Sequence, residues 1–137
     1  MSARIIFAAT AFAVTATGAL AEDFITGVYL QSEELCEQAK KETIQPVIEG
    51  GNVLLTASGI EGIEYNCEFI EVTKAKRAPA WLVHAICQEP GYVFPDVLSV
   101  TQMSPTQIDV VSVNGAGDEA TPTNTASYQF CEGVGAP

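Results

Sequence analysis

The stretch of sequence that decides the fold is EYNCEFIEV, residues 64–72, followed after a short gap by AWLVHAICQ, residues 80–88. In the second segment Trp81, Val83, Ala85 and Cys87 occupy alternate positions, which places them on one face of an extended strand. The intervening residues 74–79 are rich in charge and end in Pro, as a turn often does. Together the segments predict an antiparallel hairpin.

The register of this hairpin predicts a disulfide. Cys67 and Cys87 each lie ten residues from Arg77, so a turn about Arg77 places them directly opposite each other. Opposed residues in a non-hydrogen-bonded antiparallel pair have Cα atoms about 4.5 Å apart, within the range that a disulfide accepts. By elimination Cys36 pairs with Cys131, and we interpret both bonds as structural.

A zinc site is the alternative use of four cysteines. None of them forms a C-x-x-C pair, however, and His84 is the single histidine of the chain. An even number of cysteines in a small exported chain is typical of disulfides rather than of a metal site. We therefore expect no metal and no cofactor.

Residues 1–21 have the pattern of a cleaved signal peptide. Arg4 gives a small positive start, residues 5–18 are almost wholly apolar, and Ala19 and Ala21 are the small residues that a signal peptidase selects. The apolar stretch is shorter than the roughly 20 residues needed to span a bilayer. We expect a periplasmic or secreted protein whose residues 22–137 form a single β-rich domain.

Acidity restricts the partners of this domain. Residues 22–137 contain five Lys and Arg residues against 17 acidic residues, a side-chain charge of −12. Nucleic acid and anionic membrane surfaces would repel such a protein, whereas a cationic protein would be attracted to it. A cationic protein is therefore the partner class that the composition favours.

The rest of the sequence predicts about eight strands and one short helix. Ser32 is placed to cap a helix over residues 33–41, with acidic residues in its first turn and Lys40 and Lys41 in its last. From Pro46 onward, period-two segments alternate with turn signals. Besides the central hairpin, the expected strands are residues 27–30, 47–49, 53–57, 97–103, 107–113 and 127–132.

Short connections favour neighbouring strands that pair in sequence. We therefore predict a mainly β fold, an antiparallel β-meander or small barrel, because closure removes exposed strand edges. A two-sheet β-sandwich is the alternative. Residues 114–125, rich in Gly, Thr, Asn and Asp, are interpreted as a surface loop.

The sequence contains no recognisable catalytic constellation. His84 lies in mid-strand without a nucleophile motif, which favours a partly buried structural histidine. The run Asn114–Glu119 lacks the dense oxygen ligands of a calcium loop. We expect an exported, non-enzymatic β-domain that acts as a binding or envelope-associated protein. A small two-carboxylate hydrolase is the alternative, for which the available acids are Glu61, Glu64, Glu68, Glu71, Glu89, Asp96 and Asp109.

Two surface features follow from the predicted hairpin. Residues 74–77 carry three of the five cations of the mature chain, which suits a solvated hairpin tip. On the face opposite the cysteines, the register pairs Ile70 with His84 and Val72 with Leu82, and Ile86 lies beside them. We expect the helix over 33–41 or a second layer to cover this apolar cluster of Ile70, Val72, Leu82 and Ile86.

The spacing of these features resembles a group of uncharacterised small exported proteins of Gram-negative bacteria. The shared pattern is an early Gly-x-Tyr strand (Gly27-Val28-Tyr29), Cys36, a Glu-x-x-Cys strand (Glu64–Cys67), Cys87 and a final Tyr-x-x-Cys (Tyr128–Cys131). It spans nearly the whole mature chain. The resemblance implies a disulfide-paired β-protein and brings no activity with it.

The chain is also similar to the periplasmic C-type lysozyme inhibitors, which are small secreted β-barrels. That family carries a Ser-Gly-x-x-Tyr loop that enters the lysozyme cleft, whereas this chain has Ser58, Gly59, Ile60, Glu61 and Gly62, with Tyr65 three residues late. The likeness makes periplasmic lysozyme inhibition an alternative function. The loop of residues 58–62 would then be the partner-binding segment, because Glu61 would face a cationic cleft.

Overall fold

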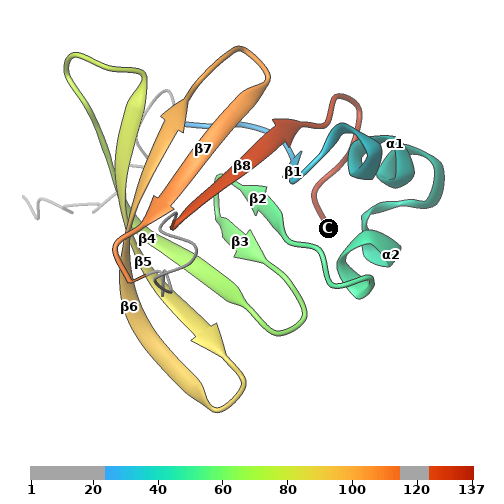
Figure 1. The fold of residues 1–137 in the computed structure, drawn as a ribbon, viewed down its shortest axis with the longest axis horizontal. Helices are drawn as coiled ribbons and strands as arrows, with labels where there is room; N and C mark the ends of the chain where they lie inside the picture. The colour runs from blue at the N-terminus through green and yellow to red at the C-terminus, as the bar shows by residue number, and fades with distance from the viewer. Residues whose placement is uncertain (1–23, 115–123) are drawn as a thin grey trace, which may run out of the picture.

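The computed structural model describes residues 24–114 and 124–137, and within them eight antiparallel strands close into a barrel in chain order (Figure 1). This confirms the predicted small eight-stranded barrel rather than the sandwich. The signal peptide predicted for residues 1–21 lies outside the described residues, as do residues 115–123 of the predicted surface loop. The elements are β1 (Tyr29–Leu30), α1 (Glu33–Glu42), α2 (Ile44–Glu49), β2 (Leu54–Thr56), β3 (Gly59–Glu61), β4 (Asn66–Lys74), β5 (Ala80–Glu89), β6 (Tyr92–Gln102), β7 (Gln107–Ser112) and β8 (Thr125–Phe130).

The barrel has a long side and a short side. Strands β4, β5 and β6 contain nine, ten and eleven residues, whereas β1, β2 and β3 contain two or three. The barrel closes at β1, which pairs with both the second and the last strand: Tyr29 lies opposite Leu55 of β2 and also opposite Phe130 of β8. Alternating inward side chains fill the interior, and this barrel core includes Leu55, Ile60, Cys67, Trp81, Val83, Cys87, Leu98, Val100, Ile108 and Tyr128.

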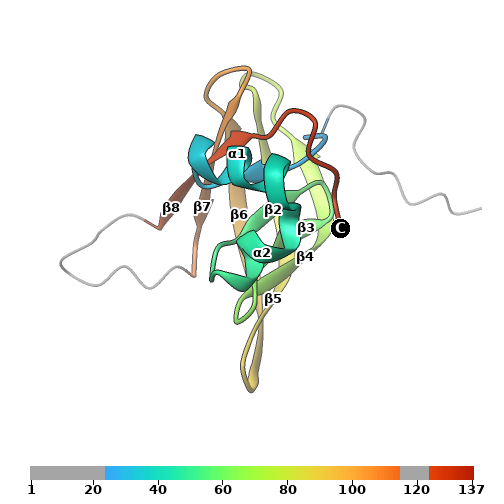
Figure 2. The same cartoon turned by 90° about the vertical axis from the view of Figure 1, so that its right-hand side faces the viewer.

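A second apolar cluster lies outside the barrel, between the helices and the first two strands. Figure 2 shows α1 and α2 in front of that part of the barrel. Along β1, Tyr29 belongs to the barrel core and Leu30 to the second cluster, as alternation along a strand requires. This helical core contains Val28, Leu30, Cys36, Ala39, Ile44, Val47, Leu54 and Cys131.

Helix α1 forms where the sequence predicts it. The hydroxyl of Ser32 accepts a hydrogen bond from the backbone N–H of Leu35 at 3.3 Å, which satisfies one of the free donors of the first turn. Acidic residues occupy that first turn and lysines the last turn. Cys36 and Ala39 lie on the buried face and anchor the helix to the helical core.

The predicted strand over residues 47–49 is wrong, because these residues form the end of α2. Ile44 and Val47 are three residues apart and both are buried, which is the spacing of one helical face. Pro46 lies in the first turn, where its missing N–H costs no hydrogen bond. The helix ends at Gly50, and the side-chain amide of Asn52 donates to the carbonyl of Val47 at 2.9 Å.

The loop predicted over residues 58–62 is also wrong, because Gly59–Glu61 form β3, which pairs with both β2 and β4. Ile60 is buried between Leu55 and Cys67 in the barrel core. Gly59 permits this pairing, because a Cβ atom at its position would collide with the carbonyl of Cys67. The glycine marks a close backbone approach rather than a flexible loop.

Both predicted disulfides are present. Cys67 lies opposite Cys87 in the β4–β5 ladder, with Cα atoms 4.0 Å apart. Cys36 of α1 is bonded to Cys131 just after β8, with Cα atoms 5.0 Å apart and 95 residues of sequence separation. One bond crosses the barrel core between neighbouring strands, and the other fixes the helices to the end of the chain.

The predicted register of the β4–β5 hairpin holds only in the half that contains the Cys67–Cys87 disulfide, away from the hairpin tip. Phe69 lies opposite Ala85 as predicted, but the register shifts between Phe69 and Glu71 through a β-bulge at Ile70. Beyond it Glu71 lies opposite His84, and Val72 lies opposite Val83 rather than Leu82. Val72 therefore packs against the barrel core instead of joining the outer apolar cluster.

The expectation that the helix over 33–41 or a second layer covers the outer cluster is wrong. Ile70, Leu82 and Ile86 are 60%, 48% and 41% exposed on the outer surface of β4 and β5, because α1 and α2 pack beside β1 and β2 instead. His84 is also exposed, not partly buried, and its Nδ1 lies 3.4 Å from Oε2 of Glu71. We call the outward surface of β4–β7 the outer face.

Several strand ends differ from prediction, most of all in β6. This strand begins at Tyr92 rather than at residue 97, because its pairing with β5 continues down to Glu89. The side-chain amide of Asn114 donates to the carbonyl of Pro95 at 2.6 Å, so this carbonyl points away from β5. In an antiparallel strand the nitrogen and the carbonyl of one residue point to the same side, so the nitrogen of Pro95 also points away from β5. A proline is tolerated there because its nitrogen lies on the unpaired edge.

No helix of the described segments is long and apolar enough to cross a membrane.

Candidate functional site

A pocket of about 640 Å³ opens at the end of the barrel where the β5–β6 hairpin extends beyond the other strands (Figure 1). It lies between that hairpin, the residues before β4 and the end of β7. We call it the end pocket, and it is lined by Tyr65, Glu89, Tyr92, Phe94, Pro95, Asp96, Ser112 and Asn114.

One wall of the end pocket is aromatic. Tyr92 and Phe94 are alternate residues of β6 and therefore share a face of the strand. Their ring centroids are 5.3 Å apart and the ring planes meet at only 23°, which is a stacked arrangement. Tyr92 is 63% exposed, so its ring presents a flat apolar surface to an incoming ligand.

A second wall is organised by a buried carboxylate. Asp96 is only 3% exposed, and both of its oxygens accept hydrogen bonds. Oδ1 accepts from the backbone N–H of Val97 at 2.7 Å and of Asn114 at 3.3 Å, and Oδ2 accepts from the hydroxyl of Ser112 at 2.5 Å. Asp96 thereby fastens the extended part of β6 to the end of β7 and gives the pocket a fixed shape.

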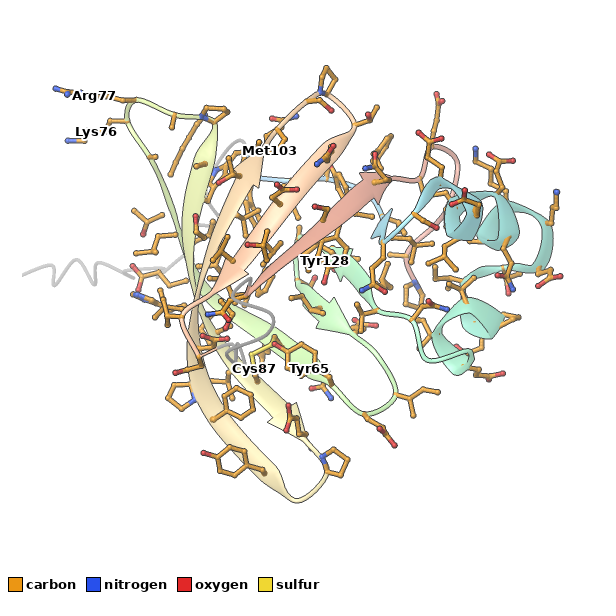
Figure 3. All side chains as sticks on the ribbon, viewed as in Figure 1. Tyr65, Lys76, Arg77, Cys87, Met103 and Tyr128 are labelled. Carbon is orange, nitrogen blue, oxygen red and sulfur yellow. A yellow bond between two sulfur atoms is a disulfide. The ribbon has the colours of Figure 1, made fainter. Side chains whose placement is uncertain are left out.

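Tyr65 lies over the disulfide of the barrel core. Its hydroxyl is 3.0 Å from Sγ of Cys67 and donates to Sγ of Cys87 at 3.7 Å. Figure 3 shows Tyr65 beside Cys87 toward this end of the barrel. Burial raises the pKa of Tyr65, and the carboxylates of Asp96 and Glu89 raise it further. The phenol therefore stays neutral and remains a donor at physiological pH.

Tyr128 lies deeper in the barrel than Tyr65 (Figure 3). It is only 3% exposed, and burial, with a smaller contribution from Tyr65, raises its pKa to about 12. Both phenols, Tyr65 in the lining of the pocket and Tyr128 in the barrel core, are thus neutral at physiological pH. The negative charge of the pocket comes from Glu89, which is exposed, and from the hydrogen-bonded Asp96.

This arrangement suits a ligand with a flat or flexible apolar part and a positive charge. A guanidinium or ammonium group stacks on aromatic faces, and it also pairs with a carboxylate such as that of Glu89. The methylene stems of Arg and Lys side chains pack on apolar walls while the head groups stay polar. A projecting Arg or Lys of another protein has both features.

The structure separates most of the acidic residues considered from sequence. Glu89 and Asp96 line the end pocket together. Glu71 lies beside His84 on the outer face, and Asp109 accepts hydrogen bonds from side chains of β7 and β8. The others do not line the end pocket.

The predicted partner-binding residues Ser58, Gly59, Glu61 and Gly62 lie elsewhere. They line a separate open hollow over β3 and β4, together with Ile60, Asn66, Cys67 and Glu68. The segment is held on both sides by strand pairing, so it does not project from the barrel as an inserting loop would.

Sequence reasoning missed the aromatic wall. Tyr92, Phe94 and Asp96 alternate as one face of a strand, and this signal was present in the sequence. Pro95 obscured it, because a proline within a run usually marks the end of a strand. Ser112, which donates to Asp96 from 16 residues away, left no local signal at all.

No group of three or more His, Cys, Asp or Glu side chains among residues 24–114 and 124–137 is arranged to hold a metal ion. The two disulfides indicate an oxidising, extracytoplasmic environment. No protein-family model, curated protein or solved structure matches the chain.

Proposed function

We propose that this protein is an exported, non-enzymatic binding domain whose end pocket receives a cationic side chain of a partner protein in the periplasm or outside the cell. The observation that carries the proposal is the combination of the stacked Tyr92–Phe94 pair with the exposed carboxylate of Glu89 in one open pocket. An apolar stem packs on the rings, and its charged head pairs with Glu89.

The overall charge supports a cationic partner. A side-chain charge of −12 on residues 22–137 accelerates encounter with positively charged proteins. The hydrogen bonds within the pocket support binding rather than catalysis. Both oxygens of Asp96 accept from donors of the protein itself, so this carboxylate is not available to act as a catalytic acid or base. Of the two acids that line the pocket, only Glu89 is exposed to meet a ligand.

A C-type lysozyme is a suitable cationic probe, and it also tests the alternative that the protein is a periplasmic lysozyme inhibitor. The oxidised mature chain is titrated with lysozyme at low salt, and both the dissociation constant and cell-wall turnover are measured. We expect binding that weakens as salt is raised, because exposed charges are screened. Inhibition of turnover would extend the proposal to the lysozyme cleft, whereas absence of binding at micromolar protein would overturn it for this probe class.

Substitutions separate the end pocket from the general charge of the protein. Glu89→Gln is expected to weaken binding about tenfold, because it removes one charge-assisted contact. Glu49→Gln removes the same charge from the surface of α2 and serves as the matched control. Equal effects of the two substitutions would show that only net charge matters and would refute the pocket.

The aromatic wall has its own test. Tyr92→Ala is expected to weaken binding about fivefold to tenfold, because the exposed ring is lost from the ligand surface. Met103→Ala is the control, since Met103 is similarly exposed but lies near the opposite end of the barrel (Figure 3). Binding that tolerates Tyr92→Ala as well as it tolerates Met103→Ala would leave the aromatic wall without a role.

A small two-carboxylate hydrolase is the second candidate, and one observation favours it. Glu89 and Asp96 line the same aromatic pocket, as a glycoside hydrolase requires of its two acids. The test is release of reducing ends from chitin oligomers and peptidoglycan by the wild-type protein and by Glu89→Gln. Turnover that disappears in Glu89→Gln would replace the binding proposal with the enzyme.

A further inference from the structure

Glu89 and Tyr92 are held side by side at the end of the β5–β6 hairpin. They lie directly opposite each other in the ladder, and only Pro90 and Gly91 separate them in the chain. Opposed residues of antiparallel strands share a face and have Cβ atoms about 5 Å apart. Both residues are exposed and line the end pocket, so its carboxylate and its outermost ring are fixed next to each other.

The protein also sets the plane of the Tyr92 ring. Tyr92 stacks on Phe94, and Phe94 lies opposite Cys87, which is fully buried and disulfide-bonded to Cys67. The inner ring of the stack is therefore backed by one of the most tightly held residues of the barrel core. Because the outer ring rests on a fixed inner ring, a ligand meets a flat surface whose orientation is set before binding.

Most side-chain donors in the lining of the end pocket already bond within the protein. These bonds are from the hydroxyl of Ser112 to Asp96, from an amide N–H of Asn114 to the carbonyl of Pro95, and from the hydroxyl of Tyr65 to Sγ of Cys87. The exposed charged group of the lining is Glu89, which is an acceptor when ionised. A ligand that pairs with the pocket must therefore bring donors of its own.

The two cationic side chains of proteins meet these features differently. A guanidinium is planar, so it lies parallel to an aromatic ring while its N–H donors point outward in its own plane, where two of them pair with one carboxylate. An ammonium is a compact and strongly hydrated charge whose three donors spread in space. Over the Tyr92 ring it cannot direct two donors at Glu89 and keep a flat contact with the ring. The adjacent ring and carboxylate therefore favour the planar cation.

We infer that the end pocket selects an arginine side chain over a lysine side chain, with the guanidinium stacked on Tyr92 and paired with Glu89. The inference rests on the proposed binding function and names the side chain that the partner projects. Tyr92 is the specificity-determining residue, because its ring distinguishes a planar cation from a compact one. Glu89 attracts either cation and distinguishes both from neutral side chains.

The size of the pocket determines the probe. Its volume of about 640 Å³ lies in the range of pockets that enclose most of a drug-sized ligand. This is more room than one side chain fills, so the arginine enters together with the peptide groups on either side of it. Short peptides are therefore better probes than free amino acids, whose terminal charges would also interact with the acidic protein.

Three acetylated and amidated peptides of the form Gly-Gly-X-Gly-Gly, in which X is arginine, lysine or citrulline, test the selectivity. Each is titrated into the oxidised mature chain at low salt, and NMR chemical shifts give the dissociation constants. We expect the arginine peptide to bind about threefold to fivefold more tightly than the lysine peptide, the size of a cation–π contact at an exposed site. The citrulline peptide has the same planar shape without the charge, and it should bind more weakly than the arginine peptide.

Substitutions assign the selectivity to its residues. Tyr92→Leu keeps an apolar surface but removes the aromatic plane, so the arginine and lysine peptides should then bind equally. Glu89→Gln should weaken both cationic peptides and leave the citrulline peptide unchanged, because only the charge pair is lost. Met103→Ala is the control, since Met103 is exposed and lies away from the pocket, and it should leave all three affinities unchanged.

The outcomes separate this inference from the proposed function. Equal affinities of the arginine and lysine peptides for the wild-type protein would overturn the inference and leave cationic binding in place. A preference for arginine that persists in Tyr92→Leu would overturn the role of Tyr92. If lysozyme binds but neither cationic peptide binds at millimolar concentration, the pocket does not recognise an arginine side chain and the inference fails. Absence of binding by lysozyme and by both cationic peptides would overturn the proposed function as well.

Discussion

The barrel core and the helical core are each crossed by one disulfide, but they are built from contacts of different range. In the barrel core, Cys67 and Cys87 belong to neighbouring strands of one hairpin and are 20 residues apart. In the helical core, Cys36 and Cys131 are 95 residues apart and join α1 to the end of the chain. One disulfide reinforces a ladder that already exists, and the other holds together segments that no ladder connects.

This difference predicts where each core is vulnerable. The barrel core is surrounded by continuous strand pairing from β4 to β8. The helical core depends on two short helices, which are too short to be stable without tertiary packing. We therefore expect the helical layer to respond most to loss of its disulfide, and the barrel to respond most to changes inside its wall.

Loss of the long-range disulfide has the largest expected effect. Replacing Cys36 and Cys131 by Ala should lower the free energy of unfolding by about 4–5 kcal/mol, against about 3 kcal/mol for replacing Cys67 and Cys87, because closing a longer loop removes more entropy from the unfolded chain. Urea denaturation gives both values. The comparison breaks if the Cys67–Cys87 pair proves more costly to remove.

A methyl group in the wall of the barrel should cost almost as much. Gly59 has a φ of 157°, and a Cβ atom there would collide with the carbonyl of Cys67 on β4. Gly59→Ala is expected to lower the free energy of unfolding by about 3 kcal/mol, from overpacking and backbone strain together. Gly51→Ala is a useful control, because its φ is also positive but its Cβ position is open. Equal losses would trace the effect to φ alone and not to the close strand approach.

High pH should weaken the barrel core. Burial raises the pKa of Tyr128 to about 12 from its ordinary value of 10.0, so the folded protein holds this proton more tightly than the unfolded chain. The associated stability is complete below pH 10 and is lost between pH 10 and 12, by about 2–3 kcal/mol in all. Denaturation measured across this range should be less pH-dependent in Tyr128→Phe than in the control Tyr92→Phe. An unchanged pH dependence would mean that the pKa of Tyr128 is the same in the folded and the unfolded chain.

The hairpin of β4 and β5 was predictable because two independent signals agree on it. Period-two alternation defines the strand over residues 80–88, and the equal spacing of Cys67 and Cys87 from Arg77 defines the pairing. The bulge at Ile70 was not predictable, since the segment alternates with equal plausibility in either register. The bulge decides which residues reach the outer face, so the covering of that face could not be predicted either.

The segments around α2 and β3 failed for a different reason. Ile44 and Val47 define a helical face, but only one turn of it, which is too short for a periodic signal. Gly59 resembles a turn residue in the sequence because loops are rich in glycine, whereas its role depends on the carbonyl of Cys67 in a strand that follows in the chain. The end pocket shares this difficulty, because Ser112 and Asp96 meet only once the barrel has closed.

The smallest expected effect lies at the start of the helical layer. The hydroxyl of Ser32 accepts a hydrogen bond from the N–H of Leu35, so Ser32→Ala leaves that donor without its cap and should lower the free energy of unfolding by about 1 kcal/mol. The loss should appear first as faster hydrogen exchange in α1, because the barrel ladder does not depend on this contact. With Cys36 and Cys131 replaced, α1 is held less firmly, and the same substitution should then cost less global stability, since a detached helix no longer unfolds together with the barrel. Equal costs in both backgrounds would show that the helical layer and the barrel unfold as one unit even without the long-range disulfide.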